Sequence, residues 1–316
     1  MTARAAPECL LRALSHTIVG QRGTVEALVL ALISDGHVLL EGPPGLAKTL
    51  ACRSLAAALN GDFKRIQFTP DLLPADIVGT RIFDQRDARF STVLGPIFAN
   101  VVLADEINRA PAKVQSALLE AMQERQVTIG PQTHALPSPF IVLATMNPLD
   151  ADGTYALPIA QLDRFLLKVT LDFPAADEER LILERFAVDH TELVSGAATL
   201  DDVRAWRRQA REIYVDEKIK RYIVDIVMAT RRAGPNGSRN ASLIEYGASP
   251  RATLALAFVA RAKALLAGRD FVLPDDVRSV ALLILRHRIG LSQRAAIDGA
   301  DPEDIVQGLI ASVGAP

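Results

Sequence analysis

The sequence predicts an α/β unit followed by a second unit made of helices. Three observations support this fold class. A glycine-rich turn over residues 42–49 joins an apolar strand to a helix, and a later apolar strand ends in two acids at residues 105–106. Helical periodicity then replaces the strand patterns after Pro174. We therefore expect a strand-containing domain over residues 1–174 and a helical domain over residues 175–316.

Length and composition indicate a globular protein with room for two packed units. The chain has 316 residues, of which 49% are hydrophobic and 23% charged, and its net charge is -2. This charge argues against a strongly basic nucleic-acid binder, although a balanced total leaves room for a local basic patch. Cys9 and Cys52 lack metal-like spacing and predict free thiols in a reducing compartment. Without a secretory leader or an apolar run of membrane-spanning length, a cytoplasmic protein is expected.

The first part of the chain alternates between helical and strand patterns. Apolar spacing over residues 9–32 predicts two helical pieces that break at Gly20. Strands are expected at residues 37–40 and 63–68, with a helix at 49–59 between them. The following stretch, about residues 69–98, contains several prolines and glycines and is too long for a plain connection. We expect it to be an insertion with a functional or packing role.

The later elements follow from the same patterns. Helices are expected at residues 111–122 and 158–165, a hairpin at about 127–139, and strands at 98–106, 140–145 and 166–173. Beyond Pro174, helical periods cover residues 176–187, 200–212, 216–232, 251–266 and 275–287, with a loop at 234–240.

The glycine-rich turn has the residue types that bind a nucleotide triphosphate. Its backbone N–H groups can converge on a phosphate at the start of the following helix, where the helix dipole favours negative charge. Lys48 would reach the β- and γ-phosphate oxygens, and the Thr49 hydroxyl would ligate Mg²⁺. Ala47 stands where the common pattern has glycine, so it needs a conformation that tolerates a Cβ. The alternative is an ordinary turn between a strand and a helix.

The two acids after the later strand suggest hydrolytic chemistry. Acids at the carboxyl end of a parallel strand lie where ligands bind in open α/β sheets. Asp105 would hold the Mg²⁺ shell, and Glu106 would orient and polarise the attacking water. Capping of the next helix is the alternative. Asn147 ends another strand and would bond the water or the γ-phosphate, although spacing alone favours a turn formed with Pro148.

Taken together, these segments resemble the AAA+ ATPases, and within them the MoxR family. The resemblance spans about residues 15–290. It rests on GHVLLEGPPGLAKT at 36–49, ADEINRA at 104–110, ATMNP at 144–148 and QLDRF at 161–165. It implies a five-stranded parallel sheet of order 5-1-4-3-2 followed by an all-α lid, and closure into rings, commonly hexamers. Alanine at position 47 is usual in this family.

The resemblance also assigns roles to single residues. Asn147 matches sensor 1, Arg251 matches sensor 2, and Arg164 matches the arginine finger offered to a neighbouring subunit. Positive charge delivered at the γ-phosphate would stabilise the transition state. Whether Arg251 serves its own nucleotide or a neighbour's stays open, as does a role for Arg109. The residues implied in ATP binding are Val19, Gly20, Gly42, Pro43, Pro44, Gly45, Leu46, Ala47, Lys48, Thr49, Leu50 and Asp105.

Two segments bear on the class of partner. The stretch at about 69–98 resembles the helix-2 insert of this branch, and the one at about 127–139 resembles its pre-sensor 1 hairpin. Related helicases place Lys or Arg there to follow a phosphate backbone. The first stretch instead balances acids against arginines, and the second has no Lys or Arg. We therefore expect a protein partner rather than nucleic acid.

The resulting hypothesis is a Mg²⁺-dependent ATPase ring that remodels or matures partner proteins. The resemblance suggests a chaperone role and a partner that carries a von Willebrand factor A domain. One alternative is a DNA-remodelling motor. Another is a nucleotide-gated scaffold without productive turnover, which the presence of both Glu106 and Arg164 argues against.

Overall fold

The structure is a computed structural model that describes residues 5–85, 89–147, 154–187, 193–231 and 243–316. Contacts divide the chain into two compact units. The first contains residues 1–157 and 169–204, and the second contains residues 158–168 and 205–316. The expected loop at 234–240 lies outside the described residues, as do Pro148, Arg86 and Asp87.

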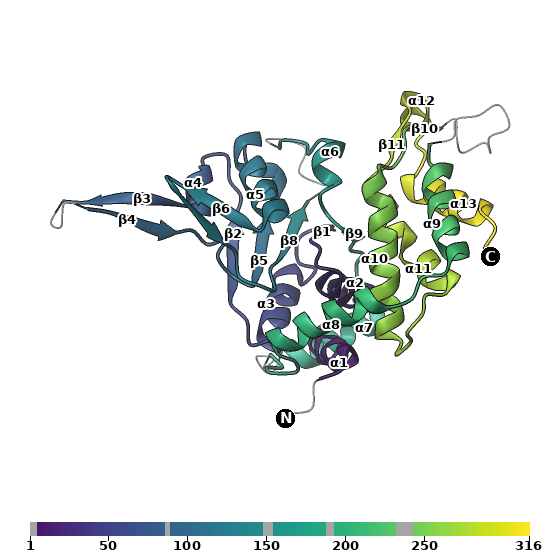
Figure 1. Cartoon of the computed structure of the whole chain (residues 1–316), viewed down its shortest axis with the longest axis horizontal. Coiled ribbons are helices and arrows are strands. Elements are labelled where there is room, and N and C mark those ends of the chain that lie inside the picture. Colours follow the sequence, from purple (N-terminus) through teal and green to yellow (C-terminus); the bar gives the residue numbers. More distant parts are fainter. Residues whose placement is uncertain (1–4, 86–88, 148–153, 188–192, 232–242) are drawn as a thin grey trace. The chain divides into compact units, whose positions relative to one another are not determined.

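A five-stranded parallel sheet forms the centre of the first unit (Figure 1). Its strands lie in the spatial order β2-β5-β8-β1-β9. Counted along the chain, this is the predicted order 5-1-4-3-2, which is confirmed. The strands are β1 (Val38–Glu41), β2 (Phe63–Gln67), β5 (Val101–Asp105), β8 (Ile141–Met146) and β9 (Leu167–Thr170).

The apolar runs of the sheet are buried, as expected for strands covered on both faces. Every residue of β5 from Val101 to Ala104 is fully buried, and so are residues 141–144 of β8. Helices α1 (Pro7–Thr17), α2 (Arg22–Ile33), α3 (Lys48–Ala58), α5 (Ala112–Glu124) and α7 (Ala176–Phe186) complete this unit with the short α4 (Pro74–Val78) and a 3-10 turn (Ile107–Arg109).

The strand register brings the predicted site residues to one edge of the sheet. Glu41, the last residue of β1, pairs with Met146 of β8, and Gln67 of β2 pairs with Asp105 of β5. Because parallel strands share a carboxyl edge, the residues that follow β1, β5 and β8 emerge side by side.

The insertion at 69–98 contains an antiparallel hairpin that extends away from the sheet (Figure 1). Its strands are β3 (Gly79–Asp84) and β4 (Arg89–Leu94). Gly79 has φ 104°, and a Cβ there would lie 2.3 Å from the Val93 carbonyl oxygen, so the base of the hairpin requires glycine. A second hairpin pairs β6 (Gln126–Ile129) with β7 (Gln132–Ala135).

The second unit is mainly helical. Its helices α10 (Pro250–Leu266) and α11 (Pro274–Leu285) pack against each other and both bury apolar residues. Ser249 caps α10 by accepting a hydrogen bond from the Arg251 amide, and Pro250 fits the first helical position. The remaining elements are α6 (Ile159–Leu162), α9 (Glu217–Ala229), α12 (Gln293–Ile297), α13 (Pro302–Ser312) and the short strands β10 (Ile244–Tyr246) and β11 (Gly290–Leu291). The boundary between the two units falls within α8 (Leu200–Glu212), after Arg204.

Among the described residues, no helix combines the length and apolar character needed to cross a membrane.

Candidate nucleotide-binding site

The glycine-rich turn is a tight loop between β1 and the start of α3. Gly45 has φ 89°, and a Cβ on Gly42 would lie 2.8 Å from the Leu171 carbonyl oxygen. Ala47 has φ 54° and ψ 20°, a left-handed conformation that costs a residue with a Cβ about 1 kcal/mol. This is how the loop accommodates alanine where the common pattern has glycine. The strain directs the backbone into the first turn of α3, which begins at Lys48.

Lys48 points back over the loop that precedes it. Its Nζ donates a hydrogen bond to the Gly42 carbonyl oxygen at 2.5 Å. Burial lowers the pKa of Lys48, while the nearby carboxylates of Asp105, Glu106 and Glu41 act in the opposite direction. The ammonium group is therefore held within the loop, where it can meet a phosphate.

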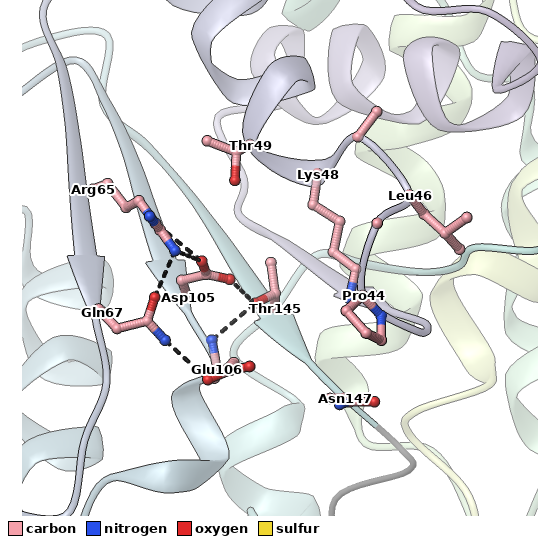
Figure 2. Close-up of a pocket in the computed structure, with 12 residues that line it drawn as sticks. Pro44, Leu46, Lys48, Thr49, Arg65, Gln67, Asp105, Glu106, Thr145 and Asn147 are labelled. Carbon is pink, nitrogen blue, oxygen red and sulfur yellow. Dashed lines mark hydrogen bonds and ion pairs between the residues drawn. The ribbon is translucent and has the colours of Figure 1, made fainter. Parts of the chain in front are cut away.

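A cavity of about 420 Å³ opens beside this loop (Figure 2). The loop forms one wall, and the ends of β2, β5 and β8 form the other. The residues that line it are Pro44, Gly45, Leu46, Ala47, Lys48, Thr49, Arg65, Gln67, Asp105, Glu106, Thr145 and Asn147. The structure thus brings together Lys48, Thr49, Asp105, Glu106 and Asn147, which the sequence analysis selected from three separate segments.

Asp105 is engaged on both of its oxygens. Oδ2 accepts hydrogen bonds from Arg65 Nε at 3.0 Å and Nη2 at 2.7 Å, and Oδ1 accepts one from Thr145 Oγ1 at 2.6 Å. The Arg65 side chain is 50% exposed and that of Asp105 16%. The carboxylate is therefore fixed at the cavity wall by one cation that solvent can reach and by one hydroxyl (Figure 2).

Glu106 lies in a left-handed conformation with φ 57° and ψ 52°. Its amide donates to Thr145 Oγ1 at 2.8 Å, and its Oε2 accepts from Gln67 Nε2 at 2.9 Å. Arg109 Nε lies 3.1 Å from the same oxygen. Arg65 Nη2 also donates to Gln67 Oε1 at 2.7 Å, so both acids belong to one network. A strained backbone at such a position is typical of a functional residue.

A larger cavity of about 910 Å³ lies on another side of the same loop. It shares the loop residues from Pro44 to Ala47 with the first cavity, and its other walls are mostly apolar. They consist of Thr17, Ile18, Val19, Gln21, Leu50, Phe173, Pro174, Ala176, Glu179, Arg180, Ile182, Leu183 and Phe186. An apolar pocket beside a phosphate loop is suited to a nucleobase.

The two residues assigned to the adenine occupy different positions in this region. Val19 lines the larger cavity, whereas Gly20 does not. Gly20 has φ 74°, and a Cβ there would lie 2.8 Å from Glu178 Oε2 of α7. Gly20 thus lets the chain turn closely against α7, which supplies one wall of the pocket.

Comparison with known proteins now identifies the family. Residues 37–167 match the ATPase family associated with various cellular activities (AAA), and residues 236–309 match the AAA lid domain. The chain is 48% identical to the chaperone MoxR1 of Mycobacterium tuberculosis over 95% of this chain and 79% of that protein. It is 35% identical to the protein MoxR of Paracoccus denitrificans over 89% of this chain and 87% of that protein.

The chain belongs to the MoxR family of AAA+ ATPases. A crystal structure of a candidate ATPase from Cytophaga hutchinsonii superposes with a TM-score of 0.91 at 43% identity, covering 98% of this chain and 94% of the other. The predicted family is confirmed, and ATPase activity follows from it.

The donors of this MoxR-family site fit Mg²⁺. Thr49 and Asp105 line the same cavity, and Mg²⁺ favours hydroxyl, carboxylate and phosphate oxygens. Within the described part of the chain no cluster of three or more His, Cys, Asp or Glu could hold a metal by itself. Mg²⁺ at phosphate-binding sites commonly keeps several waters and takes further oxygens from the substrate.

Arg164 and Arg251 both belong to the second unit. Arg164 follows α6, and its neighbour Asp163 accepts a hydrogen bond from Ser249 Oγ at 2.7 Å. Arg251 Nη1 lies 4.0 Å from Asp163 Oδ2. The structure therefore brings Arg251, matched to sensor 2, close to Asp163, the residue that precedes the finger candidate Arg164.

Sequence reasoning missed several residues of the site. Arg65, Gln67 and Thr145 hold the two acids, and the wall from α7 includes Leu183 and Phe186. A signal for the first two was present, because residues 65 and 67 of an alternating strand share a face. No local pattern marks α7 as part of the site, since it reaches the loop only through the fold.

Proposed function

We propose that the protein is a Mg²⁺-dependent ATPase that assembles into a closed ring and remodels partner proteins. Its active site would be shared between neighbouring subunits, so a monomer would be inactive. The main support for ATP hydrolysis is that one cavity is lined by all five candidate residues: Lys48, Thr49, Asp105, Glu106 and Asn147. A phosphate loop that merely bound nucleotide would need no water-polarising carboxylate beside it.

Each residue has a chemical role in this proposal. Lys48 binds the β- and γ-phosphates, and Thr49 and Asp105 hold Mg²⁺, which neutralises the charge developing on the phosphates. Glu106 polarises the attacking water, and Asn147 positions it or the γ-phosphate. The network from Gln67 to Glu106 keeps that carboxylate oriented at the cavity wall.

We further propose that the active site is completed by a second subunit. Arg164 would be delivered to the nucleotide of a neighbour, in a ring that we expect to be a hexamer. The closeness of Arg251 to the Arg164 segment favours action of both arginines at the same nucleotide. Because isolated subunits would lack these charges, turnover should depend on assembly.

The β3–β4 hairpin supports a protein partner. Phe83 and Phe90 are about half exposed and lie with their ring centroids 5.0 Å apart. Arg81 lies over the Phe90 ring, 4.6 Å from its centroid, so its charge is partly engaged. Further exposed apolar residues on the hairpin are Ile82, Val93 and Leu94. Exposed apolar surface of this kind fits protein contacts better than a phosphate backbone.

Toward partner proteins, we propose that this chain has a chaperone-like role. The relative from Mycobacterium tuberculosis is named a chaperone, and we extend that role to this chain with a partner bearing a von Willebrand factor A domain. We place this activity in the cytoplasm, which agrees with a buried Cys52 and a Cys9 that form no disulfide.

The test is ATP turnover per subunit over a range of protein concentrations. Specific activity should rise with concentration and should be lost in Arg164→Ala. Arg221→Ala, at an exposed position of α9, serves as the matched arginine control. Flat specific activity that Arg164→Ala leaves unchanged would overturn the composite site. Absence of turnover at every concentration would favour the scaffold, and salt-sensitive stimulation by DNA would favour the DNA motor.

A further inference from the structure

A single buried arginine organises the segment that contains Arg164. The Arg288 side chain is 2% exposed, and the residue lies three positions after the end of α11. A guanidinium has five N–H donors, and a buried one is stable only when they find acceptors. The five hydrogen bonds of Arg288 are Nε to Asp163 Oδ1 at 2.7 Å, Nη1 to Leu166 O at 3.1 Å and Ile284 O at 2.5 Å, and Nη2 to Phe165 O at 2.6 Å and Asp163 O at 3.5 Å.

Four of these five bonds reach the residues on either side of Arg164. Asp163 precedes it and supplies a carboxylate and a carbonyl oxygen, and Phe165 and Leu166 follow it and supply carbonyl oxygens. His287 adds a bond from Nε2 to the Phe165 carbonyl at 3.0 Å. The backbone is thus held on both sides of Arg164 by two consecutive residues from a distant part of the sequence.

The same carboxylate connects this segment to Arg251. Asp163 Oδ2 accepts from Ser249 Oγ, which in turn caps α10 by accepting from the Arg251 amide at 3.1 Å. A change in the orientation of Asp163 would therefore move the start of α10 as well as the residue next to it. The planar guanidinium of Arg288 fixes that orientation in a way that a lysine ammonium does not.

We propose that Arg288 is a positioning residue for ATP hydrolysis, which holds Arg164 and Arg251 as one rigid arrangement through Asp163. This inference rests on the proposed role of Arg164 as a finger for a neighbouring subunit. Arg288 itself is buried and does not contact nucleotide in this arrangement. Its contribution is to keep Arg164 and the exposed Arg251 in the geometry that an assembled site requires.

The experiment compares Arg288→Lys and Arg288→Gln with a matched control in the same unit. Arg269→Gln removes another arginine that makes two bonds to a buried acid, Asp276, at 2.6 and 2.8 Å. The Arg288 variants should lose about 100-fold in kcat, because misplacement of a catalytic group by about 1 Å has an effect of that size. Their affinity for Mg-ADP should stay within about threefold, since the phosphate loop belongs to the first unit. The control should keep its kcat even where its thermal midpoint falls.

Subunit mixing separates positioning from general damage to the fold. Arg288→Lys subunits are mixed with Glu106→Gln subunits, which cannot hydrolyse ATP but carry an intact Arg164 segment. Mixed rings should regain activity at interfaces where the Arg288→Lys subunit holds the nucleotide, about one quarter of the total for equal amounts. A misfolded subunit would restore no ATP turnover on mixing. If the mixture of Arg288→Lys with Glu106→Gln subunits shows no turnover, the proposal is overturned.

Arg164→Ala in the same assays distinguishes failure of this inference from failure of the proposed function. If Arg164→Ala keeps full turnover, the finger role itself is wrong. A second outcome is that Arg164→Ala is inactive alone but regains turnover when mixed with Glu106→Gln subunits. If Arg288→Lys and Arg288→Gln then keep the wild-type kcat, only the positioning role of Arg288 is refuted.

Discussion

Replacing Arg65 by alanine should tighten the binding of Mg²⁺-nucleotide. In the structure Arg65 makes two hydrogen bonds to Asp105 Oδ2, so it competes with a metal for the carboxylate that we assign to Mg²⁺. Removal of the competing cation leaves Asp105 held only by Thr145 on its other oxygen. The free energy spent on breaking the Arg65 contact would then no longer oppose metal binding.

The size of the effect follows from the exposure of the pair. The Arg65 side chain is half exposed and both bonds go to one oxygen, so the pair contributes about 0.5–1 kcal/mol rather than the larger value of a buried one. At 25 °C this corresponds to about two- to fivefold in affinity. A larger gain would mean that the ion pair is stronger than its exposure indicates.

The assay is a titration with a fluorescent ADP analogue in the presence of Mg²⁺ or of EDTA. Arg65→Ala should bind more tightly with Mg²⁺ and equally well in EDTA. Lys64→Ala, one residue earlier on the same strand, controls for the loss of positive charge near the site. Weaker binding by Arg65→Ala in Mg²⁺ would refute the reasoning, because it would show that Arg65 contacts the nucleotide.

Three further predictions concern Lys48, His287 and Phe165. Burial lowers the pKa of Lys48, so its charged form costs folding free energy at every pH below that lowered pKa. Lys48→Met should therefore raise the thermal midpoint of the nucleotide-free protein and remove the rise in midpoint that ATP causes. An unchanged midpoint of the nucleotide-free variant would contradict the predicted cost of burying the charge. Burial, helped by the charge of Arg288, lowers the pKa of His287 well below 6.5, so the unfolded state takes up a proton first as the pH falls. The free energy of unfolding should then fall below pH 6.5 by up to about 1.4 kcal/mol per pH unit, and urea unfolding of His287→Gln should lack that part of the slope. Phe165 is fully buried, so Phe165→Ala should lower the free energy of unfolding by about 3–5 kcal/mol in urea, and a loss under about 1 kcal/mol would show that the site collapses around the smaller residue.

Much of the fold was predictable because its signals are local. Apolar strands at 37–40, 63–68 and 140–145 overlap β1, β2 and β8, and the helix expected at 111–122 overlaps α5. The insertion at 69–98 was recognised by its length, whereas its hairpin was not. Both strands of that hairpin are largely exposed, so they lack the alternation of buried and exposed residues that reveals a strand.

The site shows the same division. Lys48, Thr49, Asp105 and Glu106 were selected because each follows a strand within a recognisable local pattern. Arg65 was not, because its role depends on the register that sets β2 beside β5. Arg288 was not selected either, because it is 125 positions away in sequence from Asp163, the residue that it contacts. Periodicity and spacing carry no information about contacts at that separation.

The sequence by itself determined the strands of the central sheet, the phosphate loop and the acids at the end of β5, since these depend on short-range spacing and on which residues can be buried. Only the tertiary structure decided how the acids are held, that Ala47 takes a left-handed conformation, and that α7 forms a wall beside the loop. It also decided that Arg251 lies close to Asp163, the residue before Arg164. The physical reason is that hydrogen bonds and ion pairs between distant residues form only after packing has brought their strands and helices together.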